Sequence, residues 1–174
     1  TIKACAVNSS LTIDLFTTSG KTTISSITSV VKANVFYTPQ RNKYVIVAQK
    51  TNKKINIYVY GSSIDLTYGT EFACNYGYTA VQTKNYIIIQ MLNSDFSPSN
   101  SLILLDISDA ENGNLSHKLL GVSEQQQIVS AAEISNSNYI NLVVFDYIND
   151  KYLQLLFNIP NKTFVVINDL TPVD

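Results

Sequence analysis

The sequence predicts an all-β protein, an array of about four antiparallel units, and three observations carry this prediction. Short runs rich in Ile, Val, Tyr, Phe and Thr alternate with clusters of Gly, Asn, Asp, Ser and Pro, the pattern of strands separated by turns. Signals for helices are few. Similar groups of runs recur along the chain, which indicates that the strands belong to a repeated unit.

The repeat is clearest in three segments in which a tyrosine opens an aliphatic run. These segments read NKYVIVAQ, KNYIIIQM and SNYINLVVF, with Tyr44, Tyr86 and Tyr139 as their tyrosines. TIKACAV takes the corresponding place near the start of the chain. We expect the three tyrosines to occupy equivalent positions at the start of the innermost strand of successive sheets, because position within a repeated unit determines burial.

Further apolar runs follow each of these segments, separated by polar turns. The second runs are SLTIDLF, KINIYVY, SLILLDI and YLQLLFNI, and the third runs are KTTISSI, LTYGTEFA, HKLLGVS and KTFVVI. A fourth run, ANVFYT, GYTAVQT or IVSAAEIS, follows in the first three units only. We therefore predict a single all-β domain over 1–174, with units at 1–40, 41–83, 84–136 and 137–174, the last of them incomplete.

Four antiparallel strands in a unit of about 40 to 50 residues resemble a blade of a β-propeller. The segments TIDLFTTSGKTTISSI and LLDISDAENGNLSHKLL resemble the blade pattern of an apolar strand with an Asp, a polar turn with Gly and another apolar strand. The resemblance implies a propeller-like array, in which Asp14 and Asp106 accept hydrogen bonds from backbone amides of the turn. It is a likeness of fold alone, since the chain holds no Trp and no kelch glycine pair. An antiparallel β-sandwich or jelly roll is the alternative, because the same strands can stack as two sheets.

Two segments carry helix-like features. The segment SEQQQIVSAAEI begins with a Ser that is followed three residues later by a Gln, so a short helix is an alternative over 123–134. The segment ISSITSVV spaces its apolar residues at helical intervals, but its β-branched residues and serines favour a strand.

Composition excludes several classes of partner and favours an external location. The formal net charge is -1 and the chain has no clustered basic stripe, so we predict no nucleic-acid partner. No apolar run reaches the roughly 18 to 20 residues of a membrane helix, so we predict no membrane insertion.

Charged residues make up only 14% of the chain. A surface carried by Ser, Thr, Asn, Gln and Tyr favours an extracellular, cell-surface or virion protein. Because the chain starts at Thr1, we interpret it as a processed product.

Cysteines and glycosylation motifs are compatible with that location. Cys5 and Cys74 allow at most one disulfide, and the composition leaves a disulfide and two buried thiols both open. The blade arrangement separates the two residues by more than a disulfide tolerates, so it predicts thiols. Three N-x-[ST] motifs make Asn8, Asn114 and Asn161 candidate N-glycosylation sites.

Residues that usually perform catalysis or hold cofactors are scarce. His117 is the only His and lies in an apolar run, so we predict a structural or surface role for it. The chain holds only three Cys and His residues, and they are widely spread, so no zinc site is expected. Glycine loops that would hold phosphate are missing. The segment DISDAENGN holds Asp106, Asp109 and Glu111 without calcium-loop spacing, and we interpret it as a solvated turn. We predict no enzyme, no cofactor and no metal.

An incomplete last unit leaves an open sheet edge, and this edge is the candidate functional site. Few charges defend it. The expected edge residues are Thr163, Phe164, Val165, Val166 and Ile167. We expect a protein partner or a second copy to pair with this edge, which makes the chain a structural or interaction module. The alternative is a ligand-binding domain that recognises a glycan or a protein, for which the eleven tyrosines could supply an aromatic surface.

Overall fold

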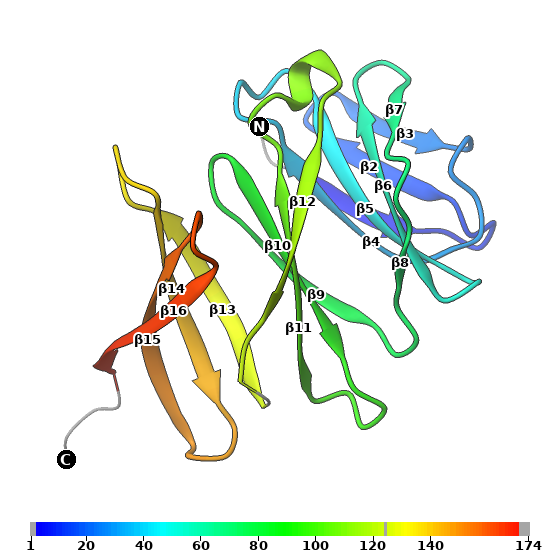
Figure 1. Cartoon of the computed structure of the whole chain (residues 1–174). Coiled ribbons are helices and arrows are strands. Elements are labelled where there is room, and N and C mark those ends of the chain that lie inside the picture. Colours follow the sequence, from blue (N-terminus) through cyan, green and yellow to red (C-terminus); the bar gives the residue numbers. More distant parts are fainter. Residues whose placement is uncertain (1–2, 124, 171–174) are drawn as a thin grey trace. The chain divides into compact units, whose positions relative to one another are not determined.

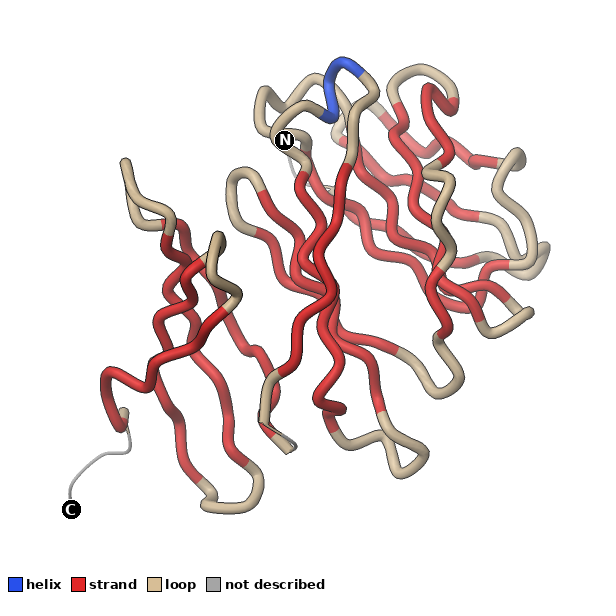
Figure 2. Tube along the Cα trace, viewed as in Figure 1, coloured by secondary structure: helices blue, strands red, loops and turns tan. Residues whose placement is uncertain are grey.

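The computed structural model describes residues 3–123 and 125–170 and shows an all-β protein, as predicted. Its strands form four small antiparallel sheets (Figures 1 and 2). Within the described residues, the one helical element is a single 3-10 turn, η1 (Ala110–Asn112). The chain divides into two compact units. The first comprises the residues up to Asn75 together with Ile107–Leu115, and the second comprises Tyr76–Asp106 and the residues from Ser116 onward.

The first unit contains the first two sheets. Its three-stranded sheet has the order β1 (Ala4–Val7), β2 (Ile13–Thr17), β3 (Gly20–Ile24). Its second sheet has the order β4 (Val30–Tyr37), β5 (Tyr44–Lys50), β6 (Lys54–Tyr60), β7 (Ile64–Thr67), and β8 (Phe72–Ala73) also pairs with β6. The two sheets share a core to which Ile13 and Leu15 contribute from β2 and Ile46 from β5.

The second unit contains the other two sheets. One has the order β9 (Tyr78–Gln82), β10 (Tyr86–Leu92), β11 (Pro98–Asp106), β12 (Ser116–Gly121). The other has the order β13 (Gln126–Glu133), β14 (Tyr139–Asp146), β15 (Lys151–Asn158), β16 (Thr163–Asp169). Their shared core joins Ile88 and Leu104 of the third sheet to Leu142, Val144 and Leu155 of the fourth.

The pairing of the strands corrects the phase of the predicted repeat. Each run predicted to end a unit instead begins the next sheet: ANVFYT lies in β4, GYTAVQT in β9 and IVSAAEIS in β13. Tyr44, Tyr86 and Tyr139 do hold equivalent places, since they begin β5, β10 and β14, the second strand of each sheet. The prediction that these strands are innermost in their sheets is wrong, because a preceding run pairs with each of them.

The same shift moves the incomplete sheet from the end of the chain to its start. The prediction of an incomplete last unit is wrong, because β13 supplies the fourth sheet with its fourth strand. Among the described residues, the first sheet has three strands. The helix alternative over 123–134 is also wrong, since residues 126–133 form β13 and pair with β14. Pairing along a whole strand outweighs a local capping signal. Only the ends of ISSITSVV are strand, because residues 25–29 are the connection between β3 and β4.

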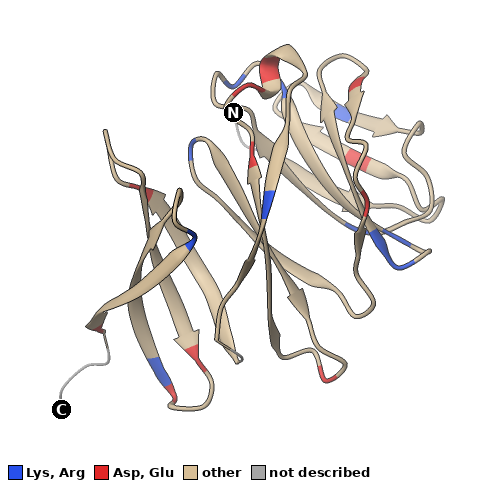
Figure 3. Cartoon of the chain, viewed as in Figure 1, with Lys and Arg blue, Asp and Glu red and all other residues tan. Residues whose placement is uncertain are grey.

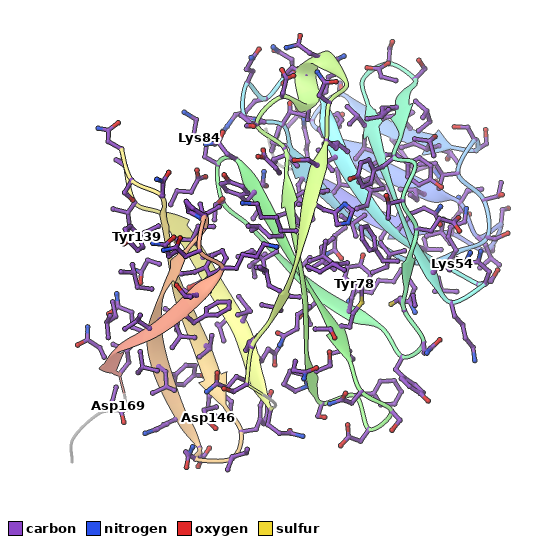
Figure 4. All side chains as sticks on the ribbon, in the orientation of Figure 1. Lys54, Tyr78, Lys84, Tyr139, Asp146 and Asp169 are labelled. Atoms are coloured by element: carbon purple, nitrogen blue, oxygen red, sulfur yellow. The ribbon has the colours of Figure 1, made fainter. Side chains whose placement is uncertain are left out.

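Burial patterns show that the fourth sheet has one covered face. In β10, consecutive residues 87–90 are all buried, as in a strand covered on both faces. In β14, Ile140, Leu142 and Val144 are buried and alternate with residues that are only half-buried or exposed. Tyr139 and Asp146, labelled in Figure 4, lie at the two ends of this strand. The covered face of the fourth sheet therefore packs into the core of the second unit, and the other face carries half-buried side chains.

A buried amide links the third and fourth sheets. Gln90, on β10, is only 1% exposed. Its Nε2 donates to the carbonyl oxygens of Ser99 (3.0 Å) and Gln126 (2.7 Å), and its Oε1 accepts from the N–H of Ile128 (2.9 Å). The side chain thus satisfies backbone groups of β11 and β13, which would otherwise be costly to bury.

Candidate functional site: an open strand edge

β16 is the outermost strand of the fourth sheet and pairs only with β15 among the described strands. All five residues expected at the edge lie on it (Figure 1). After β16, the N–H of Leu170 donates to the carbonyl oxygen of Tyr152 (2.9 Å). As far as residue 170, the chain therefore continues along β15 and leaves the outer side of β16 uncovered.

Two hydrogen bonds determine which backbone groups of β16 face outward. The N–H of Ile159 donates to the carbonyl oxygen of Asn138, so every second β15 residue counted from Ile159 bonds to β14. The N–H of Leu170 donates to the carbonyl oxygen of Tyr152, so the β15 residues between those bond to β16. Along an antiparallel ladder, residues alternate between pairs that exchange hydrogen bonds and pairs that do not. With the observed register, this alternation directs the N–H and C=O groups of Phe164 and Val166 to the open side.

The side chains along this edge are apolar and exposed. Val165 is 57% exposed and Val166 is 59% exposed, and Ile167 beside them is exposed as well. Val166 lies opposite Leu155 and Phe164 lies opposite Phe157, and both of these β15 residues are in the core. The rings of Phe164 and Phe157 stack with their centroids 4.7 Å apart. Val166 therefore lies on the core-facing side of the sheet and yet remains open to solvent.

In strand order, the last strand of each of the other three sheets carries a charged residue before its final position, whereas β16 carries none before Asp169. β3 holds Lys21, β7 holds Asp65 and β12 holds Lys118. In β16 the first charged residue is Asp169, at the C-terminal end of the strand, and Figure 3 shows the strand uncoloured before it. Natural proteins usually defend an edge with charge, a bulge or a cover. Of these defences, β16 has only a bulge, which lies near its C-terminal end, where the pairing with β15 shifts between Gln154 and Leu155.

A hollow adjoins the edge on the core-facing side. Its volume is about 430 Å³, and Phe164 and Val166 line it together with Leu155 and Val122. Strand addition gives affinity through main-chain hydrogen bonds and specificity through pockets for alternate side chains. The outward backbone groups of β16 supply the hydrogen bonds, and the hollow supplies a pocket for a side chain. Sequence reasoning identified the edge from its apolar run but missed the hollow, because Val122 and Leu155 belong to segments that only the fold brings together.

The Asp expected to cap a turn has different partners. Asp14 Oδ1 accepts from the side chains of Thr23 (2.6 Å) and Asn8 (3.0 Å), and its Oδ2 lies 3.4 Å from Lys21 Nζ. Hydrogen bonding, chiefly from Thr23, holds the pKa of Asp14 below its ordinary value. The expectation of backbone amides as its partners is wrong, because Asp14 lies inside β2 rather than at its end.

The candidate glycosylation sites differ in how their side chains are used. Asn8 Nδ2 donates to Asp14, and its Oδ1 accepts from Thr12 and from the N–H of Ser10. Asn114 Nδ2 donates to Asp109 at 2.5 Å. Asn161 is exposed in the turn between β15 and β16. Glycosylation at all three positions stays a prediction.

The remaining candidate residues do not converge on a catalytic or metal site. No disulfide joins Cys5 to Cys74, both of which the structure describes. His117 is half-buried on β12 and lines a cavity of about 40 Å³ with Tyr86 and Asp106, enough for roughly one water molecule. Over residues 3–123 and 125–170, no cluster of His, Cys, Asp and Glu is placed to hold a metal ion, and no helix could span a membrane.

The acidic segment interpreted as a solvated turn is in fact tied to the second sheet. Glu111, on η1, accepts hydrogen bonds from the hydroxyl of Thr38 and from the N–H of Asn42 (3.3 Å). Lys43 Nζ donates to the carbonyl oxygen of Glu111 (3.1 Å). The segment fixes the β4–β5 hairpin, which gives its carboxylate a structural role.

No protein-family model matches the chain, and no curated protein matches it either. The function is therefore inferred from the residues and geometry of the chain itself.

Proposed function

We propose that the chain is a non-catalytic structural or interaction module that assembles by strand pairing at β16, with a second copy of the chain as the partner. The observation that carries the proposal is the exposure of Val165 and Val166 on an outer strand that carries no charge before Asp169 and directs the backbone groups of Phe164 and Val166 outward. An edge of this kind is a template for another strand. Pairing would convert two four-stranded sheets into one continuous sheet.

A two-fold axis at Val165 gives the pairing a consistent register. In an antiparallel arrangement about this axis, Val165 lies opposite its own counterpart, and Phe164 lies opposite Val166 of the second copy. The outward N–H and C=O groups of these residues then meet each other. Every residue paired between Thr163 and Ile167 is uncharged, so the register sets no like charges opposite one another.

The hollow is accounted for by the same arrangement. Because Phe164 and Val166 share one face of the strand, the phenyl ring of Phe164 from the second copy covers Val166. It also reaches the hollow that Val166 lines. The contact removes from water a valine that lies on the core-facing side of the sheet, and burying such a side chain favours association by about 1.5 to 3 kcal/mol.

The wider setting of this module is proposed on compositional and repeat grounds. Four successive antiparallel sheets, three of which have a second strand that begins with a tyrosine, support a propeller-like array. The low share of charged residues supports an extracellular, cell-surface or virion location. A closed two-fold pairing gives a dimer, and further contacts elsewhere would extend it to a coat or filament.

Sedimentation velocity over a wide range of protein concentration tests the proposal. The unmodified chain is expected to dimerise as concentration rises. The Val166→Pro variant removes an outward N–H and keeps the bonds to β15, and Val166→Lys places a charge on the edge; both are expected to remain monomeric. Circular dichroism establishes that each variant is folded.

A matched control separates edge pairing from general stickiness. Val31→Lys changes another exposed valine on an outer strand, β4. This control is expected to dimerise like the unmodified chain. A monomer at every concentration for the unmodified chain would overturn the proposal, and so would dimers of both Val166 variants. The alternative, a ligand-binding domain, would then take its place.

A further inference from the structure

A group of aromatic side chains lies on the less covered face of the fourth sheet. Phe145 on β14 contacts Tyr147 edge-on, with ring centroids 4.7 Å apart, and Tyr152 on β15 in the same manner at 4.9 Å. Tyr147 is 52% exposed and Tyr152 is 46% exposed. Phe145 pairs across the strands with both Tyr152 and Gln127, so the three side chains form one row on this face.

The row borders a hollow large enough for a small ligand. Its volume is about 450 Å³, and the first strand of the third sheet completes its wall at Thr79 and its neighbours. Sites for small molecules commonly occupy roughly 300 to 1,000 Å³ and combine aromatic walls with a few polar groups. Both this wall and the aromatic row belong to the second unit.

The described polar residues that line the hollow are uncharged. Tyr147 donates its hydroxyl hydrogen to Gln127 Oε1 (2.9 Å), and both residues line the hollow. Thr79 adds a hydroxyl group. The nearest carboxylate along the chain, Asp146, is buried and accepts from the Asn149 side chain (2.9 Å) and from backbone N–H groups of its own turn. Among residues 3–123 and 125–170, no Lys, Arg, Asp or Glu lines the hollow.

We propose that this hollow binds a neutral saccharide. A pyranose ring presents an apolar face of C–H groups that packs on the faces of tyrosine rings, and its hydroxyl groups hydrogen-bond to amides and hydroxyls. A charged ligand would find no opposite charge among the described lining residues. The saccharide site is distinct from the β16 edge, which lies along the other side of the sheet and uses backbone groups.

Titration followed by ¹H–¹⁵N NMR tests the site with methyl glycosides of glucose, galactose, mannose and N-acetylglucosamine as probes. At least one glycoside is expected to shift the amide signals around Thr79, Gln127 and Tyr147. In Tyr147→Ala and Tyr152→Ala, the dissociation constant of that glycoside is expected to rise about tenfold, the upper range for one aromatic contact. Tyr147→Phe keeps the ring and is expected to weaken binding less.

Two controls make the outcome decisive. Tyr76→Ala removes a tyrosine that is 48% exposed in the same unit but does not line the hollow, and it is expected to bind like the unmodified chain. Val166→Lys is also expected to bind normally, which separates the saccharide site from the assembly edge. Absence of shifts with all four glycosides, shifts confined to other residues, or equal weakening by Tyr76→Ala would each overturn the proposal.

Discussion

At the scale of single residues, Asp146 shows how one carboxylate shapes a turn. It accepts hydrogen bonds from the N–H groups of Ile148 (3.0 Å) and Asn149 (3.1 Å) and from the Asn149 side chain. The Asn149 side chain contributes most to holding the pKa of Asp146 below its ordinary value, while burial acts in the opposite direction. An Asp followed by Asn in a turn is a recognisable signal, which the search for repeats passed over.

The lowered pKa gives a pH-dependent stability. A carboxyl with a lower pKa in the folded state stabilises the fold above its unfolded pKa of about 3.9, and this contribution is lost as pH falls through the folded pKa. Denaturant unfolding at pH 7 and pH 3 is expected to show less of this acid loss in Asp146→Ala than in the unmodified chain. Asp150→Asn, an exposed change in the same turn, is expected to retain the full loss. An identical acid loss in Asp146→Ala would contradict this role.

Gln90 is the residue whose replacement should cost the second unit most. Gln90→Leu keeps the bulk but leaves the N–H of Ile128 and two carbonyl oxygens without their partner. The free energy of unfolding is expected to fall by about 3 kcal/mol, since each unsatisfied buried group costs about 1 to 3 kcal/mol. Gln154→Leu, which removes side-chain bonds to Asn141 and Asn168, is expected to cost less than about 1 kcal/mol. Equal losses in urea unfolding would contradict this account.

The two cysteines should react slowly in the folded chain. Burial, with a smaller effect from Asp14, raises the pKa of Cys5 to about 11, and Cys74 is buried. The thiolate is the reactive form, so little of Cys5 reacts near pH 8. Iodoacetamide is expected to leave the native chain largely unmodified and to add two carbamidomethyl groups to the unreduced chain in urea. An unfolded, unreduced chain that gains none would reveal a disulfide instead.

At the scale of elements, the turns decide which glycosylation motif is usable. An oligosaccharide on Asn8 or Asn114 would disturb bonds that its amide makes to Asp14 or Asp109. Asn161 is exposed in the β15–β16 turn. When the chain passes through a secretory pathway, peptide mass spectrometry is expected to find the highest occupancy at Asn161. Higher occupancy at Asn8 would show that its turn forms after glycosylation.

Sequence patterns located most strands but not their partners. Runs such as YIIIQM and NYINLVVF became β10 and β14 because apolar, β-branched segments fit a buried sheet. The phase of the repeat was missed, because pairing between IVSAAEIS and β14 is a tertiary choice that neither run encodes alone. The edge at Val165 was visible from its apolar, uncharged run. The hollow beside Val166 and the aromatic row at Phe145 were not, because their members come from separate strands.

At the scale of the whole molecule, the chain consists of two units of two sheets each, and every sheet leaves outer strands. In three of the four sheets the last strand in strand order carries a charged residue before its final position, whereas β16 presents exposed valines and no charge before Asp169. We propose that this edge of β16 pairs with another copy of the chain. A dimer built in this way would leave the aromatic hollow accessible, so assembly and saccharide binding are compatible.

Amide hydrogen exchange measured residue by residue at increasing protein concentration tests this claim most directly. The N–H of Val165 faces β15 and is expected to be protected at every concentration. The N–H groups of Phe164 and Val166 face the open edge, and they are expected to exchange rapidly in dilute solution and to become protected as the dimer forms. Rapid exchange of Phe164 and Val166 at all concentrations would contradict pairing at β16.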